Sequence, residues 1–222
     1  MKHTLIPLAG ALLGALVAAH ASAETQLYET GPSADSSFVR FLNGNAEPVT
    51  ITNGAAQLVL GRGAEARVSK FLPVKGGASL SAHAQLGSQK LPLQVVAQPS
   101  EFVTMAVFGK DASARTVLLR EKPDDFNAMR ASVALLNLDE KCTSASLLAS
   151  PKNTLILDAV APTQVKRRLV NPVKLSVQVN CNGKPVGAVL DMAQLQAGER
   201  YSVFVLPGKA AAQTFFVMDS TP

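Results

Sequence analysis

Short stretches in which apolar and polar residues alternate predict that this chain is built from β-strands. In the segment 37–43, Val39 and Phe41 point to one face and Arg40 points to the other, which is the period-two pattern of a half-buried strand. The segment 131–137 repeats the inward-facing pair. Both segments are therefore expected to be strands with one apolar and one polar face.

Turn signals separate these strands at short intervals. The Asn-Gly pair at 182–183 lies between the apolar-rich segments 175–179 and 186–190, and it predicts a tight hairpin because both residues tolerate positive φ. Gly87 holds the same place earlier in the chain, and the prolines suit turns and strand edges. The one weak helical candidate is the segment 191–196.

The pattern of strands and turns occurs twice along the chain. Asn43 aligns with Asn137 at an offset of 94 residues, and Phe102 aligns with Tyr201 at an offset of 99. Small changes in offset are what loops of different length would produce, while the order of the strands is kept. The chain therefore reads as two copies of one strand-rich unit.

These observations predict an all-β fold of two tandem Ig-like antiparallel β-sandwich domains related by internal duplication. We place the first domain at 24–121, a linker at 122–130 and the second domain at 131–222. Each unit has a length at which a single β-sandwich commonly folds.

The first 23 residues have the features of a cleaved signal peptide. Residues 2–3 are basic, residues 5–19 are apolar and residues 21–23 are small, which predicts cleavage between Ala23 and Glu24. We therefore expect an exported, periplasmic protein, with an uncleaved membrane anchor as the alternative.

Charge and composition narrow the set of partners. The formal net charge of +5 falls to +4 without the predicted signal peptide, which contains one lysine and no acidic residue. This mildly basic chain is compatible with an anionic polysaccharide, whereas nucleic acid is excluded by the expected compartment. The chain has no tryptophan and two tyrosines, so it offers few flat platforms on which sugars could stack. We expect a monomer when the protein is isolated.

Residues that could carry catalysis or bind a metal are scarce. His83 is the only histidine after the predicted signal peptide, it falls in a predicted strand, and no nucleophile motif accompanies it. One histidine and two cysteines do not make a tetrahedral zinc site, and an all-oxygen calcium site lacks a supporting motif. We therefore expect no catalytic residue, no metal and no cofactor; an enzyme that uses Asp or Ser without histidine is the alternative.

The two cysteines are predicted to form a disulfide within the second unit. Cys142 and Cys181 are 39 residues apart, and an exported setting favours their oxidation. Closing a loop of this length stabilises a fold by roughly 3 to 4 kcal/mol in the chain-entropy picture.

The densest basic feature is the stretch 165–174. Together with the strand 37–43 it could contact an acidic protein surface or an anionic polymer, although charges on a sheet edge also discourage aggregation. The candidate contact residues are Phe38, Arg40, Lys166, Arg167, Arg168 and Lys174.

The segment Leu27 to Asn43, with its Leu-Tyr pair, its proline and its Ser-Ser-Phe-Val-Arg run, resembles the AlgF family of periplasmic alginate O-acetylation proteins. The segments 70–73, 87–92 and 168–174 resemble the same family in the same order. The resemblance covers most of the chain after residue 23, and the motifs that carry it are structural.

The resemblance implies a non-enzymatic adaptor that links a membrane O-acyltransferase to periplasmic acetyltransferases during exopolysaccharide O-acetylation. The polymer could be alginate or another polysaccharide such as cellulose. The alternative from a different class is a periplasmic pilus-type chaperone with two Ig-like domains. Such chaperones lend a long alternating strand to a subunit, and the segment 115–120 is short and alternates poorly.

Overall fold

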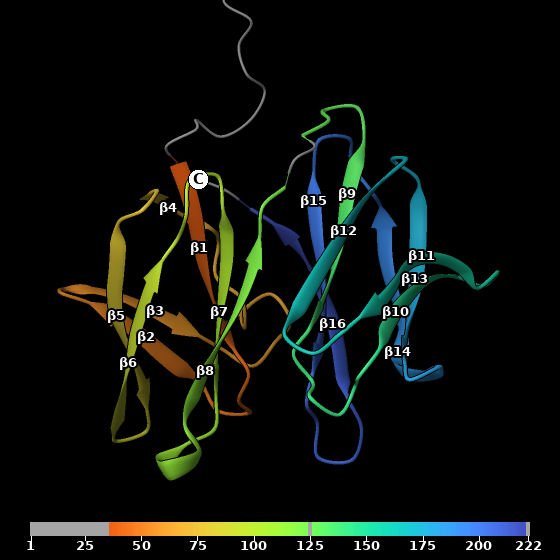
Figure 1. The fold of residues 1–222 in the computed structure, drawn as a ribbon. Coiled ribbons are helices and arrows are strands. Elements are labelled where there is room, and N and C mark those ends of the chain that lie inside the picture. Colours follow the sequence, from red (N-terminus) through yellow and green to blue (C-terminus); the bar gives the residue numbers. More distant parts are fainter. Residues whose placement is uncertain (1–35, 124–125, 221–222) are drawn as a thin grey trace, which may run out of the picture.

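The computed structural model describes residues 36–123 and 126–220, most of which form β-strands (Figure 1). These strands make four sheets of four strands each, arranged as two similar halves. The predicted all-β fold with an internal duplication is confirmed. The predicted signal peptide, with its cleavage between Ala23 and Glu24, lies outside the described residues.

The first half contains two sheets, with strand orders β4-β1-β7-β8 and β3-β2-β5-β6. A short 3-10 turn (Asp111–Ser113) precedes its last strand. Its strands are β1 (Ser36–Asn43), β2 (Val49–Asn53), β3 (Ala56–Leu60), β4 (Leu72–Lys75), β5 (Ser79–Leu86), β6 (Gln89–Val96), β7 (Phe102–Phe108) and β8 (Arg115–Glu121).

The second half repeats this topology, with strand orders β12-β9-β15-β16 and β11-β10-β13-β14. Each strand corresponds to the strand of the first half whose number is lower by eight. Its strands are β9 (Ala131–Asn137), β10 (Ala145–Ser150), β11 (Thr154–Val160), β12 (Gln164–Val170), β13 (Lys174–Cys181), β14 (Lys184–Gln194), β15 (Arg200–Leu206) and β16 (Gln213–Asp219).

The structure differs from the sequence prediction in two details of the strands. One sheet of each half contains a parallel pair, β1 with β7 and β9 with β15, where antiparallel sheets were expected. The helical candidate 191–196 is wrong, because residues up to Gln194 belong to β14 and pair with β13. Met192 and Leu195 are buried in the core of the second sandwich, and this packing outweighs a weak local helical preference.

A buried asparagine closes the equivalent corner of each half. The side-chain amide of Asn43 donates to the Glu47 carbonyl at 2.8 Å, and that of Asn137 donates to the Cys142 carbonyl at 2.7 Å. Each amide also donates to the carbonyl of the last residue of the third strand of its half. The alignment of Asn43 with Asn137 therefore corresponds to a shared structural role.

The predicted disulfide between Cys142 and Cys181 is present in the second half. Their Cα atoms lie 5.2 Å apart, and the bond connects the turn after β9 to the end of β13. Cys142 is buried within the apolar core of this sandwich.

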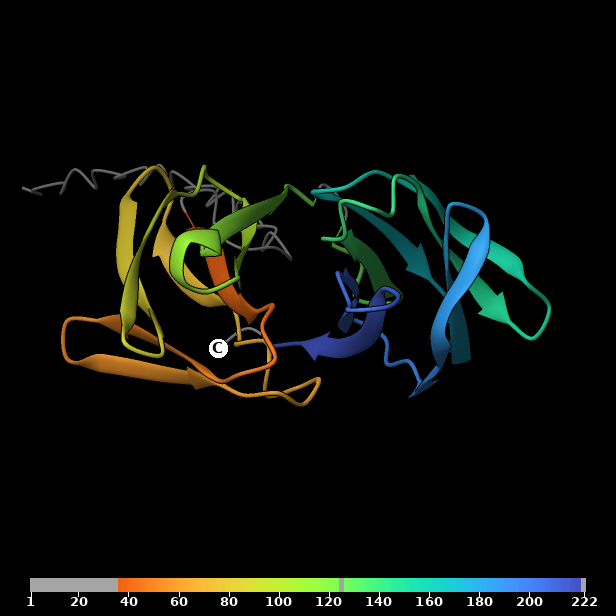
Figure 2. The ribbon, with the colours of Figure 1, turned by 90° about the horizontal axis from the view of Figure 1, so that it is seen from below.

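The described residues form three apolar cores. One lies inside each sandwich, and the third lies between the halves, where the sheet β4-β1-β7-β8 faces the sheet β12-β9-β15-β16 (Figure 2). We call this contact the seam. Its apolar residues come from both halves: Leu42, Ala106, Phe108, Leu119, Ala134, Leu136, Leu138, Phe204, Leu206 and Val217.

The seam changes the interpretation of β1 and β9, the two strands whose alternation of apolar and polar residues led the sequence prediction. β1 and β9 were expected to present a polar face to solvent, but β9 is buried along its whole length and so is β1 from Val39 onward. Both faces of these strands are covered, one by the second sheet of their own sandwich and the other by the opposite half.

Candidate functional site

Charged side chains gather at the seam, beside its apolar core. Arg40, on β1, donates to the Asp219 carboxylate at 2.6 Å, to the Ser202 hydroxyl at 2.9 Å and to the Thr104 hydroxyl at 2.8 Å. Its guanidinium lies 4.3 Å from the centre of the Phe71 ring. Only 2% of the Arg40 side chain is exposed, so this residue connects the two halves from within.

Arg167 makes the complementary connection from the second half. It forms a bidentate ion pair with Glu121, the last residue of β8, and donates a further hydrogen bond of 3.2 Å to Asp219. It also donates to the Ser132 hydroxyl at 3.2 Å. A guanidinium that binds two carboxylates and a hydroxyl is fixed in position, and Arg167 therefore joins the ends of β8 and β16.

Arg200, on β15, has fewer partners than the other two arginines. Its Nη2 lies 3.6 Å from a Glu121 oxygen, and its guanidinium lies 4.7 Å from the centre of the Phe102 ring. Its Nε and Nη2 atoms are buried without a hydrogen bond among the described residues. Burial, together with the nearby charge of Arg167, lowers the pKa of Arg200 to about 10.

Ion pairing favours the charged forms of Asp219 and Arg167. Burial by itself would raise the pKa of Asp219, but Arg40 and Arg167 outweigh it and hold that pKa below its ordinary value. Burial would lower the pKa of Arg167, but Glu121 and Asp219 outweigh it and raise that pKa. Three arginines face two carboxylates, which leaves one positive charge in excess.

The two carboxylates of the cluster, but not its arginines, occupy equivalent positions in the duplicated fold. In the first half Phe102 pairs with Glu121, and in the second half Arg200 pairs with Asp219. Glu121 and Asp219 therefore occupy equivalent ends of β8 and β16. The predicted alignment of Phe102 with Tyr201 is wrong by one residue, because Arg200 is the structural counterpart of Phe102.

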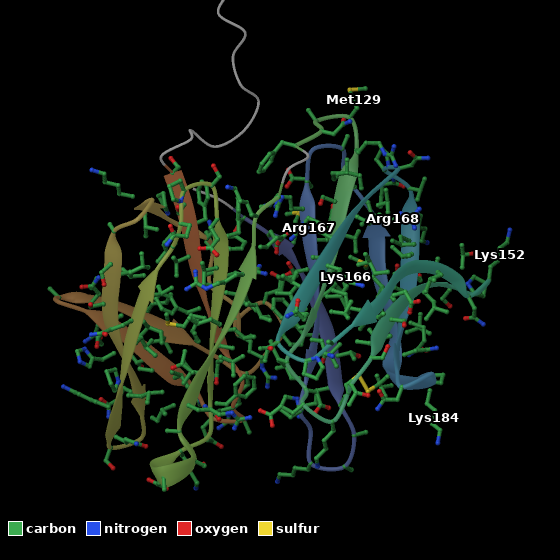
Figure 3. The ribbon with its side chains drawn as sticks, viewed as in Figure 1. Met129, Lys152, Lys166, Arg167, Arg168 and Lys184 are labelled. Carbon is green, nitrogen blue, oxygen red and sulfur yellow. A yellow bond between two sulfur atoms is a disulfide. The ribbon has the colours of Figure 1, made fainter. Side chains whose placement is uncertain are left out.

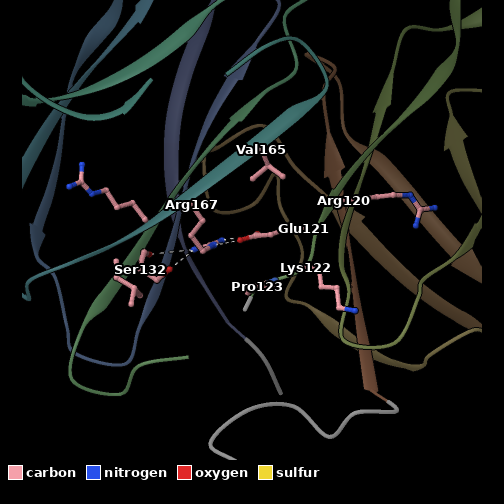
Figure 4. A pocket seen from close by; sticks show the side chains of 9 residues that line it. Arg120, Glu121, Lys122, Pro123, Ser132, Val165 and Arg167 are labelled. Carbon is pink, nitrogen blue, oxygen red and sulfur yellow. Dashed lines mark hydrogen bonds and ion pairs between the residues drawn. The ribbon is translucent and has the colours of Figure 1, made fainter. Parts of the chain in front are cut away.

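Two adjoining hollows open at the edge of the seam, and we call them together the seam groove. Their volumes are about 380 and 140 Å³, and they share Ser132 and Leu169 in their walls. Figure 4 shows the larger one. Glu121 is the carboxylate among the described lining residues. The cations that line the groove are Arg120, Lys122, Arg130, Arg167, Arg168 and Arg200.

Other parts of the described chain are weaker candidates for a binding or catalytic site. A hollow of about 830 Å³ lies between loops of the first half and Lys209, from the β15–β16 loop of the second half, and it is lined by charges of both signs, Glu47 and Asp111 with Lys110 and Lys209. The described residues contain no cluster of side chains that could hold a metal ion. His83 is exposed on β5, away from the seam.

The structure corrects two of the predicted contact residues. Arg40 and Arg167 cannot meet a partner through their charges, because both guanidinium groups are buried in the ion cluster. Phe38 is half-buried, with its ring stacked on that of Phe102 at 4.7 Å.

Three predicted contact residues are exposed, but they do not lie together. Lys166 and Arg168 project from β12 (Figure 3). Lys174 begins β13, in the other sheet of the second sandwich. The Lys166 ammonium donates to the Asp158 carbonyl, and the Arg168 guanidinium donates to the Ile156 carbonyl. A role for these three residues in binding stays a prediction.

Sequence reasoning missed several residues of the seam, above all Glu121, Asp219 and Arg200. A signal existed for the two acids, because each closes the last strand of its repeat. The arginine gave no such signal, since its counterpart in the first half is a phenylalanine.

The fold and the seam define a class of protein in which two duplicated β-sandwiches are joined through a buried ion cluster. The described residues contain no helix long and apolar enough to cross a membrane. The profile of the family described as "Alginate O-acetyl transferase AlgF" matches residues 10–202, so the chain belongs to the AlgF family.

A curated relative agrees with this assignment. The chain is 29% identical over 182 residues to the "Alginate biosynthesis protein AlgF" of Pseudomonas fluorescens, covering 82% of this chain and 77% of the relative. It is also similar to the C-terminal domain of AlgF from P. aeruginosa, at 23% identity over 40% of this chain and 98% of that domain. The TM-score of 0.35 for that pair is too low to support a structural argument.

Proposed function

We propose that this protein is a non-catalytic periplasmic adaptor in exopolysaccharide O-acetylation, which brings acetyltransferases of one system together. Membership of the AlgF family supports a role in alginate O-acetylation. The observation that carries the adaptor role is the seam, because it fixes two sandwiches as one body and uses its buried charges to do so. A body of this kind can present fixed surfaces to two partners.

The geometry supports a binding role over acetyl transfer, although the family description contains the word transferase. Acyl transfer requires a nucleophile activated by a base, with donors aimed at the developing oxyanion. Among the described residues, no hydrogen bond joins the His83 ring to a hydroxyl or a carboxylate. The hydroxyls of Thr104 and Ser202 are instead bound within the ion cluster.

The proposed partners are a membrane O-acyltransferase and the periplasmic acetyltransferases that act with it. A periplasmic location agrees with the disulfide between Cys142 and Cys181, since such bonds persist in oxidising compartments. The polymer that receives the acetyl groups is alginate in this proposal, with another polysaccharide such as cellulose as the alternative.

The seam argues against the pilus-type chaperone. The strand that would be lent to a subunit corresponds to β8, whose Leu119 is buried in the seam and whose Glu121 is held by Arg167. A strand engaged in this way is not free to complete another protein's sheet.

The test is the acetyl-ester content of the secreted polysaccharide in a strain that lacks the protein, normalised to polymer yield and compared with a complemented strain. Loss of acetyl groups while polymer is still made would support the proposal. Unchanged acetylation would refute it. Acetyl-ester hydrolysis or transfer by the purified protein, abolished by a point substitution, would refute the non-catalytic part.

A further inference from the structure

We propose that the seam groove is a docking site for an acidic segment of a protein partner, whose carboxylates bind the cations of the groove. This inference rests on the adaptor function proposed above and names the surface that serves it. The groove takes its walls from both halves and from the connection between them, since Lys122 and Arg130 flank that connection.

The charge of the groove favours an anionic occupant. Its described walls contain six cations and one carboxylate; that carboxylate, Glu121, binds Arg167, so the other five cations are the ones that a partner could meet. Arg120 is paired with Glu101 at 2.8 Å, whereas the Lys122 ammonium is exposed and has no ion pair or hydrogen bond among the described residues. Positive charge in excess, concentrated in a hollow, raises the local concentration of an opposite charge.

Unused donors in the wall add a second argument. The Nε atoms of Arg130 and Arg200 are buried without a hydrogen bond, and so is Nη2 of Arg200. Buried donors of this kind cost free energy unless an acceptor reaches them. A carboxylate entering the smaller hollow, which both arginines line, would provide acceptors and would neutralise the extra charge of the ion cluster.

The shape of the groove favours a peptide side chain over a polysaccharide. The smaller hollow has a volume of about 140 Å³, which is enough for the carboxylate and the methylene groups of an acidic side chain but too small for a chain of sugar rings. The larger hollow has no aromatic residue in its walls, and the Phe126 ring of the smaller one lies 5.7 Å from the Arg200 guanidinium. The described walls therefore offer one half-buried ring, where a sugar chain would need several flat rings on which to stack.

The test measures binding of each purified periplasmic acetyltransferase of the same system to the immobilised mature protein. The groove variant carries Lys122→Glu and Arg168→Glu, two exposed sites outside the ion cluster. The matched control carries Lys152→Glu and Lys184→Glu, which change the net charge equally at exposed sites of the second half that lie away from the groove (Figure 3). Thermal melting confirms that both variants fold.

We expect the groove variant to bind one acetyltransferase at least tenfold more weakly, while the control stays within twofold of the wild type. Equal binding by all three proteins would overturn the docking site but leave the adaptor function intact. If the wild type binds no acetyltransferase at tens of micromolar, both the adaptor function and this inference fail.

Competition identifies the chemistry of the occupant. A synthetic hexaglutamate peptide should displace the acetyltransferase, and an oligouronate with the same number of carboxylates should not. Displacement by the oligouronate alone would assign the groove to the polymer and overturn the inference. Asp124 and Asp125 follow the groove residue Pro123 in the sequence and lie outside the described residues. Their replacement by Asn should preserve binding; loss of binding would contradict a site made of cations.

Discussion

Removing the central carboxylate of the ion cluster should release the two halves from each other. Asp219 accepts hydrogen bonds from Arg40 at 2.6 Å, from Ser202 at 2.9 Å and from Arg167 at 3.2 Å, and its side chain is 1% exposed. Breaking a buried ion pair by removing one partner costs about 3 to 5 kcal/mol, because the remaining charge stays buried. We expect Asp219→Asn to destabilise the protein by about this amount.

The assay is thermal or urea unfolding of the purified mature protein. For a chain of this size, about 1 kcal/mol shifts the Tm by roughly 2 to 4 °C, so the expected fall is about 6 to 20 °C. The matched control is Glu140→Gln, which removes an exposed ion pair with Arg115 that also joins the two halves. An exposed pair contributes about 0 to 1 kcal/mol.

A double variant distinguishes the cost of leaving a buried charge unpaired from the cost of losing the ion pair itself. Replacing Arg40 by Met and Asp219 by Leu together removes the buried pair without leaving a lone charge, and it should cost less than Asp219→Asn alone. If Asp219→Asn is no more destabilising than Glu140→Gln, the ion cluster does not hold the seam and the reasoning is refuted.

Three further predictions follow from the same contacts. The pKa of Asp219 is lowered in the folded protein, so its contribution to stability is complete above the unfolded pKa of about 3.9 and is lost as the pH falls further. The pH dependence of the unfolding free energy in acid should therefore differ between Asp219→Asn and the wild type. Identical acid unfolding profiles would contradict this. Reducing the bond between Cys142 and Cys181 should lower the unfolding free energy by roughly 3 to 4 kcal/mol, measured with and without reductant, and an unchanged midpoint would speak against it. Asn43→Ala and Asn137→Ala should each lower the unfolding free energy, measured with urea, by about 1 to 3 kcal/mol for each backbone group left without its hydrogen bond. An unchanged unfolding free energy for either variant would show that the backbone there does not depend on the asparagine amide.

The sequence predicts the repeated sandwiches well because their evidence is local. Alternation and turn residues are properties of a few neighbouring positions, and the hairpin at 182–183 and the disulfide are both present in the structure. Which strands become neighbours is a long-range choice, and the parallel pairing of β1 with β7 leaves no mark on either segment.

The ion cluster was beyond sequence reasoning for a related physical reason. An arginine that points away from the core of its own sandwich looks the same whether it meets water or another sheet, and Arg40 was therefore expected to be accessible. The apolar run 105–108 gave a hint, since strands buried on both faces lose their alternation. Recognising the seam would have required reading this run together with the uninterrupted apolar positions of 133–136.

The pairing of Arg40 with Asp219 joins residues 179 positions apart, close to the two ends of the described chain. During synthesis, β1 to β8 are complete long before β16 exists. Until then Arg40 lacks its carboxylate, and the apolar surface around Leu42 and Leu119 has nothing to cover it. The first sandwich by itself would therefore expose an apolar surface of the kind that promotes aggregation, and that surface is covered only when the second half folds against it.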